Sequence, residues 1–324
     1  MTTGVHPASG KKSVTERLHL STQVVLLGVV GVEAALFAVL IPEFLTTTNL
    51  LNAARATSYL AILSIGVTFG LISGAIDLSV GSVLAISGVM GHVMITAGLP
   101  GPIAAAVAIV TGVLFGFLNG VITVRFRVHS LITTLGMLSV ARGLAFVIAD
   151  DLAPPSRDAF FNMFQNRLLG VPLTVLLAIA IFIVGYFVLA HTRFGQYAYA
   201  IGDNGAAARD AALPVDRLRI KYLIVSGALA GLAGWVLAST IGIGYKGAGA
   251  GYELTVITAV LLGGVGFTGG SGSMVGTLIA IVLMGILTNG MNLYGLNSSY
   301  QAIVIGAMLL VALGLQARRS GGFR

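Results

Sequence analysis

Only a few polar side chains interrupt the apolar runs of this chain, and Asp77 and Ser79 form the first such pair, in the segment GAIDLSVG at 74–81. They lie where one hydrophobic stretch stops and the next one starts. Both side chains can accept hydrogen bonds from the N–H groups of a new helix, which lipid cannot satisfy. We expect helix capping here; the alternative is a polar gate or contact point on a solute path.

Arg142 lies inside the apolar run 130–149, where a cation must be paired or face water. Its candidate partners are Asp150, Asp151 and Glu253. An ion pair between helices is the commoner use of such a residue, and a contact with a solute is the alternative.

Three Asn side chains also fall in apolar runs, at positions 119, 289 and 292. Amides there either hold helices together or bind a polyol, and the former is commoner. The candidate residues of a path or gate are Asp77, Ser79, Asn119, Arg142, Glu253 and Asn289.

Catalytic and metal chemistry find no support in the residue pattern. The chain has no Cys, and His92, His129 and His191 lack the spacing of metal ligands. No Gly-rich strand-to-helix turn carries the Lys-Ser/Thr pair that cradles a phosphate. We therefore expect no catalytic residue, no metal, no cofactor and no ATP site in this chain.

One long polar segment, residues 191–221, separates two runs that are each long enough to cross a bilayer. Its Ala-rich middle, 204–213, predicts a short helix with Asn204 as the N-cap. A short helix between membrane spans is either a docking surface or an ordinary loop. The segment holds the cations Arg193, Arg209, Arg217, Arg219 and Lys221 and the acids Asp203, Asp210 and Asp216.

The composition defines the class of protein. Hydrophobic residues make up 56% of the chain and charged residues 9%, too few to cover a water-soluble surface. The 44 Gly residues fit close helix packing in lipid. We predict an all-α polytopic membrane protein whose first apolar run is a retained span and not a cleaved signal peptide.

Apolar runs and turn residues predict about ten spans, with eight or nine possible because the eighth and ninth runs are short. Residues 1–20 form a polar head, 21–316 the transmembrane domain and 317–324 a tail. Residues 43–55 and 150–170 are expected to be connections, and 242–251 and 263–272 Gly-rich turns. The expected spans are 21–41, 56–75, 78–96, 103–124, 130–149, 171–190, 222–241, 254–267, 274–288 and 300–315.

The distribution of cations predicts the orientation. Thirteen of the 18 Lys and Arg residues fall in the head, after the fourth span, in the polar segment and in the tail. Because cytoplasmic loops collect Lys and Arg, these regions are expected inside the cell, together with both termini.

A weak internal repeat relates two parts of the chain. DLSV at 77–80 resembles ELTV at 253–256, and Asn119-Gly120 precedes Gly136 at the distance by which Asn289-Gly290 precedes Gly306. The third span then corresponds to the eighth and the fourth to the ninth. An offset of five spans inverts the second copy, and such repeats place a solute path at their interface.

Four stretches carry a family resemblance: GAIDLSVGSVLAISGVMG (74–91), HSLITTLGMLSVARGLAF (129–146), TRFGQYAYAIGDNGAAAR (192–209) and GYELTVITAVLLGGVGFTGGSGSMVGT (251–277). Together they resemble the permease subunits of ribose/xylose-type sugar ABC importers, over about residues 46–315. The resemblance implies a type II importer fold in the bacterial cytoplasmic (inner) membrane.

The same resemblance implies partners and a coupling site. The partners are two cytoplasmic ATPase subunits that use ATP and Mg²⁺, a second permease copy or a paralogue, and a periplasmic or lipid-anchored sugar-binding protein. The polar segment becomes the coupling segment, seated in a cleft of the ATPase through Gly202, Asn204, Ala207, Ala208 and Arg209. The chain departs from the usual family pattern at Ala75, Gly205, Ala206, Ala212 and Ser271. Gly205 and Ala206 stand where the family usually has acids, so docking on the ATPase is expected to differ in strength or in partner.

Two other classes of transporter remain open at this point. An ion- or proton-coupled secondary transporter would use Asp77, Glu253 or Glu33 as proton sites. An ABC permease for nucleosides or amino acids would share the fold. The solute itself, whether a pentose, a hexose or a related polyol, does not follow from the residues.

Overall fold

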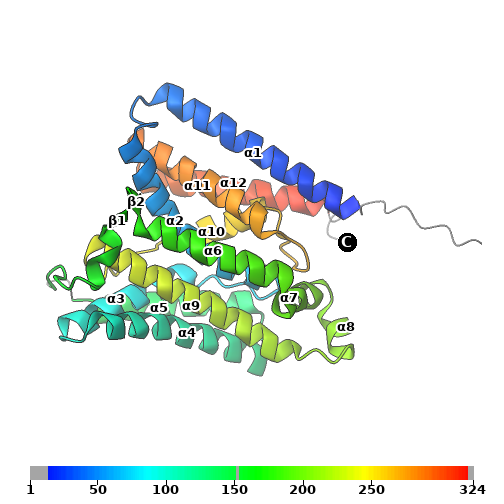
Figure 1. The fold of residues 1–324 in the computed structure, drawn as a ribbon. Coiled ribbons are helices and arrows are strands. Elements are labelled where there is room, and N and C mark those ends of the chain that lie inside the picture. Colours follow the sequence, from blue (N-terminus) through cyan, green and yellow to red (C-terminus); the bar gives the residue numbers. More distant parts are fainter. Residues whose placement is uncertain (1–13, 151–152, 320–324) are drawn as a thin grey trace, which may run out of the picture.

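The computed structural model describes residues 14–150 and 153–319, which are almost entirely helical (Figure 1). A 3-10 turn, η1 (Phe161–Gln165), and a small antiparallel hairpin, β1 (Arg167–Leu168) and β2 (Val171–Pro172), lie between α5 and α6. The helices are α1 (Val14–Leu40), α2 (Thr47–Ile72), α3 (Val80–Thr96), α4 (Gly101–Arg125), α5 (Ser130–Ile148), α6 (Leu173–His191), α7 (Arg193–Asp203), α8 (Gly205–Asp210), α9 (Val215–Ile241), α10 (Tyr252–Leu262), α11 (Met274–Leu293) and α12 (Ser298–Arg319).

The predicted all-helical, polytopic architecture is confirmed. Seven helices of the described part of the chain, namely α1, α2, α4, α5, α6, α9 and α11, are long and apolar enough to cross a membrane. Three more apolar helices, α3, α10 and α12, are shorter in their apolar part. Each of the ten expected spans overlaps one of these ten helices. However, α10 has only 11 residues, roughly 17 Å of helix, and does not cross a bilayer core of about 30 Å.

Several helix starts differ from the sequence prediction. Helix α1 begins at Val14, inside the expected head, of which residues 1–13 lie outside the described part. Helix α2 begins at Thr47, so the expected connection 43–55 is wrong for most of its length. The Thr46 hydroxyl caps α2 by accepting the Asn49 N–H, and the Asn49 amide donates to the Phe44 carbonyl at 2.8 Å. This capping supports a polar first turn that hydropathy alone does not recognise as helix.

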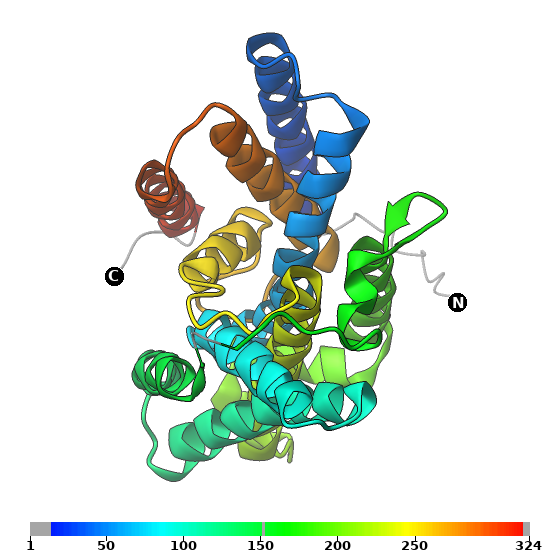
Figure 2. The same cartoon turned by 90° about the vertical axis from the view of Figure 1, so that its left-hand side faces the viewer.

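Helices α2 and α9 form the centre of the molecule, and α1 lies at one edge (Figure 2). Their backbones approach closely because small residues meet there: a Cβ on Gly66 would lie 2.7 Å from the Ser226 Cα. Helix α4 crosses α9 in the same way, with Gly112 against the backbone of Gly227 and Gly231. Such contacts drive helix association in lipid, where burial of apolar surface contributes little.

Helices of each half of the chain pack on the central helix of the other half. Helix α4 lies along α9 and α11 lies along α2, while α3 also packs on α9 and α10 on α2. Each half therefore covers the central helix of the other half, as expected for two inverted copies. This packing supports the correspondence of α3 with α10 and of α4 with α11.

The first and last described helices end on one side of the molecule. In Figure 1 the start of α1 and the end of α12 lie at the right, at the end of the molecule that also carries α7 and α8.

Replacing Gly112 by Ala should lower the melting temperature of the purified protein in detergent. The added Cβ would collide with the Gly227 carbonyl and approach the Gly231 backbone to 2.8 Å, and overpacking of this kind costs about 1–3 kcal/mol. Gly28→Ala is the matched control, because Gly28 lies in α1 with nothing within 4 Å of a new Cβ. Equal melting temperatures of the two variants would contradict the α4–α9 packing.

Candidate coupling and translocation site

The polar segment 191–221 folds into α7 and α8 before α9 begins at Val215. The Thr192 hydroxyl accepts the Gly195 N–H to cap α7. The Asn204 Oδ1 accepts the N–H groups of Ala206 and Ala207 at 3.1 and 3.0 Å to cap α8. The predicted short helix and its Asn204 cap are confirmed, whereas α7 was not predicted.

The end of α7 is fixed to two breaks between helices. A Cβ on Gly202 would collide with the Ile72 carbonyl at the end of α2 and with the Gly270 N–H in the turn 263–272. That turn is itself joined to α2, because the Gly270 N–H donates to the Ile72 carbonyl at 2.8 Å. Gly269 and Gly270 have φ of 92° and 72°, a backbone region that favours glycine. Three backbone segments thus meet here without intervening side chains.

A side-chain hydrogen bond supports the same junction. The Tyr199 hydroxyl in α7 donates to the Gly272 carbonyl at 3.0 Å. Burial raises the pKa of Tyr199, so its hydroxyl stays protonated and remains a donor at neutral pH.

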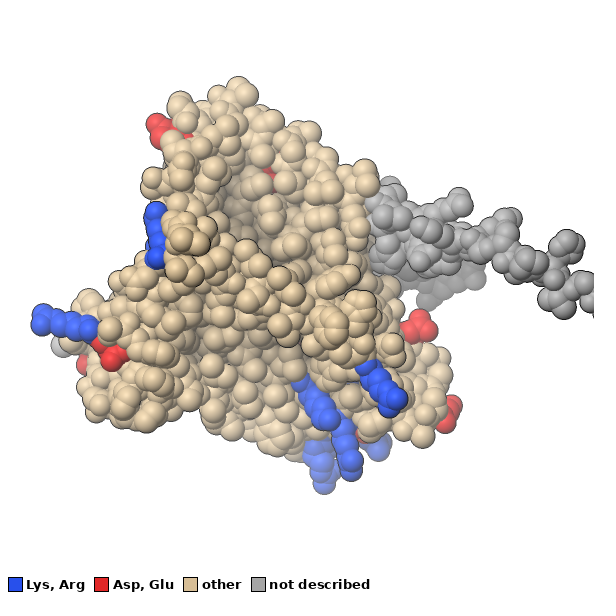
Figure 3. All heavy atoms as spheres, in the orientation of Figure 1, with Lys and Arg blue, Asp and Glu red and all other residues tan. Residues whose placement is uncertain are grey.

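The outward face of the polar segment is exposed and basic. Arg209 and Asp216 form an ion pair at 2.9 Å that connects α8 to α9, with both side chains about half exposed. Ala208, on the inner face of α8, is buried, while Asn204 and Ala207 are exposed. Lys and Arg side chains gather at this end of the molecule (Figure 3). The exposed cations there are Arg125, Arg127, Arg193, Arg209, Arg217 and Lys221.

Asp77 organises a buried polar cluster at the break between α2 and α3. Its Oδ1 accepts the Ser79 N–H at 2.9 Å and the Ser79 hydroxyl at 2.6 Å, and its Oδ2 accepts the Ser226 hydroxyl of α9 at 2.8 Å. Asn119 of α4 donates to the Ser79 Oγ at 2.9 Å. The predicted capping of α3 by these two side chains is wrong, because Asp77 accepts only the N–H of Ser79, the residue before the helix, and Ser79 makes no side-chain capping bond. The cluster therefore joins α3, α4 and α9.

Hydroxyl groups of α5 satisfy the backbone of the same break. The Ile76 N–H donates to the Ser130 Oγ at 2.9 Å, and the Leu78 N–H donates to the Thr134 Oγ1 at 3.1 Å. Ser130, Thr134 and Ser226 were not predicted as part of this cluster. Their only signal was the presence of hydroxyls in apolar runs, which are too common there to be diagnostic.

Arg142 of α5 holds the turn 242–251. Its Nη1 donates to the Lys246 and Ala248 carbonyls at 3.0 and 2.7 Å. Of the acids expected to pair with it, Glu253 attracts it electrostatically, and Asp151 lies outside the described residues. The expectation of a carboxylate as the main partner is corrected to two backbone carbonyls. Glu253 itself packs on Gly81, where an added Cβ would collide with its carboxylate.

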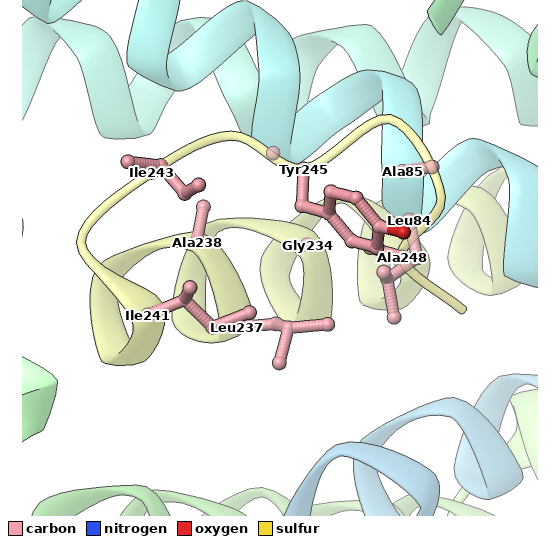
Figure 4. Close-up of a pocket in the computed structure, with 10 residues that line it drawn as sticks. Leu84, Ala85, Gly234, Leu237, Ala238, Ile241, Ile243, Tyr245 and Ala248 are labelled. Carbon is pink, nitrogen blue, oxygen red and sulfur yellow. The ribbon is translucent and has the colours of Figure 1, made fainter. Parts of the chain in front are cut away.

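The turn held by Arg142 closes over α3 and α9. Ile243, Tyr245 and Ala248 lie against side chains of these two helices (Figure 4). The space beneath the turn is about 10 Å³, room for at most one water molecule. A solute larger than water does not fit here in this conformation.

Asn289 lies apart from the other candidates. Its amide and that of Asn49 exchange hydrogen bonds at 2.9 and 3.0 Å, joining α11 to α2. The six path candidates thus fall into three groups: Asp77 with Ser79 and Asn119, Arg142 with Glu253, and Asn289 alone. Asn289 therefore bridges two helices, as expected.

These features define a polytopic membrane permease with internal helix breaks. The sequence profile of the family described as branched-chain amino acid transport system / permease component matches residues 49–313, and the chain belongs to this family.

Individual relatives cover most of the chain. It is similar to the ribose import permease protein RbsC of Escherichia coli K12, with 37% identity over 86% of this chain and 88% of that protein. RbsC of Bacillus subtilis 168 is 35% identical over 87% of this chain and 89% of its own length. The L-arabinose ABC transporter permease protein AraH of Azospirillum brasilense is 35% identical over 95% and 91%. No solved structure matches the chain.

Replacing Asp77 by Ala should destabilise the protein by on the order of 2–3 kcal/mol, because it removes the acceptor of three buried hydrogen bonds. Asp77→Asn keeps one acceptor oxygen and should fall between the parent and the Ala variant in thermal unfolding in detergent. If the Ala variant melts with the parent, Asp77 is not a structural anchor.

Proposed function

We propose that this chain is the transmembrane permease subunit of an ABC importer for a monosaccharide, driven by ATPase subunits on separate polypeptides. One observation carries the proposal: an exposed pair of capped helices, α7 and α8, contacts both helix breaks of the membrane core through Gly202. A surface that is exposed outside and connected to the core inside can transmit force from a partner. Family membership and the RbsC and AraH relatives support this assignment.

The mechanism follows from where α7 is attached. ATP binding closes the partner subunits and displaces α7 and α8, and the Gly202 contact passes this motion to Ile72 and Gly270. The next residues, 73–79, form the break anchored to α5 by Ser130 and Thr134. We infer that the break and α5 move together, and that the path alternates between two discrete packings biased by nucleotide.

The proposed assembly extends beyond this chain. Of the five residues expected at the ATPase contact, the exposed Asn204, Ala207 and Arg209 form it, whereas Gly202 packs on the core and Ala208 is buried. The ATPase binds and hydrolyses ATP with Mg²⁺. A second permease copy completes the path, and a periplasmic or lipid-anchored binding protein delivers the sugar. The basic end in Figure 3 faces the cytoplasm, which makes both termini cytoplasmic.

A pentose is the proposed solute. The relatives are named for ribose and L-arabinose, two pentoses, whereas the family description refers to branched-chain amino acids. Permeases named for pentoses match nearly nine-tenths of this chain or more, which favours a sugar over an amino acid.

Reconstitution tests the class of transporter. The chain alone in liposomes should not accumulate labelled ribose or L-arabinose, and uptake should need the ATPase, the binding protein and ATP. An uncoupler should leave this uptake unchanged. Uptake by the chain alone, abolished by the uncoupler, would establish a proton-coupled carrier instead.

Gly202→Ala should uncouple the importer, because its Cβ collides with the Ile72 carbonyl. We expect uptake to fall at least about tenfold, equivalent to about 1.4 kcal/mol, while the complex still assembles and hydrolyses ATP. Gly205→Ala is the matched control, since its Cβ meets only the Arg219 Nη2 at 3.5 Å. Unchanged uptake by the Gly202 variant would contradict the proposed route of coupling.

A further inference from the structure

A basic cavity of about 700 Å³ lies between the polar segment and the membrane core. Its walls come from four places: the break after α2, the end of α4, the link from α4 to α5, and the α8–α9 region. This volume is typical of small-molecule sites. The residues that line it are Gly74, Ala75, Thr123, Val124, Arg127, Val128, His129, Ser130, Arg209, Asp216 and Arg219.

The lining carries an excess of positive charge. Three guanidinium groups, those of Arg127, Arg209 and Arg219, face one carboxylate, that of Asp216. Asp216 already accepts a hydrogen bond from Arg209 at 2.9 Å. Arg219 is attracted by Asp216 but repelled by Arg209. The Arg and Asp side chains of the lining together carry a net charge of two positive units.

Two buried polar atoms of the lining have no partner among the described residues. They are the Nε of Arg219 and the Oγ1 of Thr123, and Thr123 is only 8% exposed. Buried polar groups are normally hydrogen-bonded, and an unmade bond costs about 1–3 kcal/mol. Because both atoms are fully buried, a ligand in the cavity would contact the exposed side chains of Arg127 and Arg209 and not these two atoms themselves.

We propose that this cavity binds a phosphate group, from a soluble phosphorylated molecule or from a lipid headgroup. A phosphate monoester carries close to two negative charges at neutral pH and accepts several hydrogen bonds, which matches the charge and the donors of the cavity. Guanidinium groups bind phosphate oxygens in pairs, and Arg is suited to this recognition.

A phosphate bound in this cavity affects transport, a consequence that rests on the proposed function. The ligand would bridge Arg209 and Arg219, next to α8, to the link at Arg127 and to the break at Ala75. These parts must move relative to one another in the proposed mechanism. A bound phosphate holds them in one arrangement and therefore slows import from the cytoplasmic side.

Direct binding tests the site without any need for transport. Ribose 5-phosphate would be titrated into the full-length permease in phosphatidylcholine nanodiscs by calorimetry, with ribose as the uncharged control. We expect binding with a Kd of about 1 mM or tighter for the phosphate and none for ribose. In nanodiscs that contain phosphatidylglycerol, weaker binding of ribose 5-phosphate would identify the lipid as a competing source of the phosphate.

Two pairs of variants make the test specific. Arg219→Gln should weaken binding at least about tenfold, whereas Arg217→Gln, an exposed Arg on the same helix outside the cavity, should not. Gly205→Asp places a carboxylate beside Arg219, because a Cβ there lies 3.5 Å from the Arg219 Nη2. It should weaken binding as much as Arg219→Gln, while Gly205→Asn should not.

The outcomes separate this proposal from the assigned function. No binding of ribose 5-phosphate or phosphatidylglycerol would overturn the phosphate site, and ATP-driven uptake would be unaffected by that result. If the parent protein binds no phosphate and Arg219→Gln no longer co-purifies with the ATPase, the cavity binds an acidic side chain of the ATPase instead. That result would overturn the phosphate site. Equal binding by all four variants would also reject it.

Discussion

The contact of Gly202 with the Ile72 carbonyl and Gly270 is the constraint on which the rest of the structure depends. It joins three backbone segments without a side chain between them, and the Gly270 N–H closes it by donating to Ile72 at 2.8 Å. Side chains can absorb a displacement by changing rotamer, whereas packed backbone cannot. In the proposed mechanism, a displacement of α7 is therefore passed to the end of α2 through this contact, so that a short surface helix acts on the buried core.

The membrane sets a second constraint, because every buried polar group must find a partner inside the protein. The break between α2 and α3 meets it with the Asp77 carboxylate and with hydroxyls from α5 and α9. Asp77 is 2% exposed and both of its oxygens accept hydrogen bonds. A proton carrier must exchange its proton with water, so this geometry suits an anchor of helices better than a carrier.

The sequence predicted the helices well because long apolar runs, Gly and Pro mark their positions, and it predicted α8 because Asn204 is a strong N-cap. It failed where the decisive contact is long-range or involves the backbone. The partners of Arg142 are carbonyls of a distant turn, and no residue type encodes a carbonyl. Ser226 meets Asp77 across 149 positions of the chain. Hydropathy missed the start of α2, because a capped polar turn resembles a loop.

The hydrogen bonds among the polar side chains of the core have a consequence for selectivity. Asp77, Ser79 and Ser226 bond to one another, and Arg142 is committed to the turn 242–251. These four side chains are therefore engaged with the protein, whereas the Asn119 Oδ1 and the Glu253 Oε2 have no hydrogen-bond partner among the described residues and stay free to contact a solute. Conduction requires binding weak enough for release, and a core in which the four side chains named first are already engaged would meet that requirement. In the proposed importer, selection among sugars would fall to the protein that delivers the solute, and the membrane chain would contribute the timing of the passage.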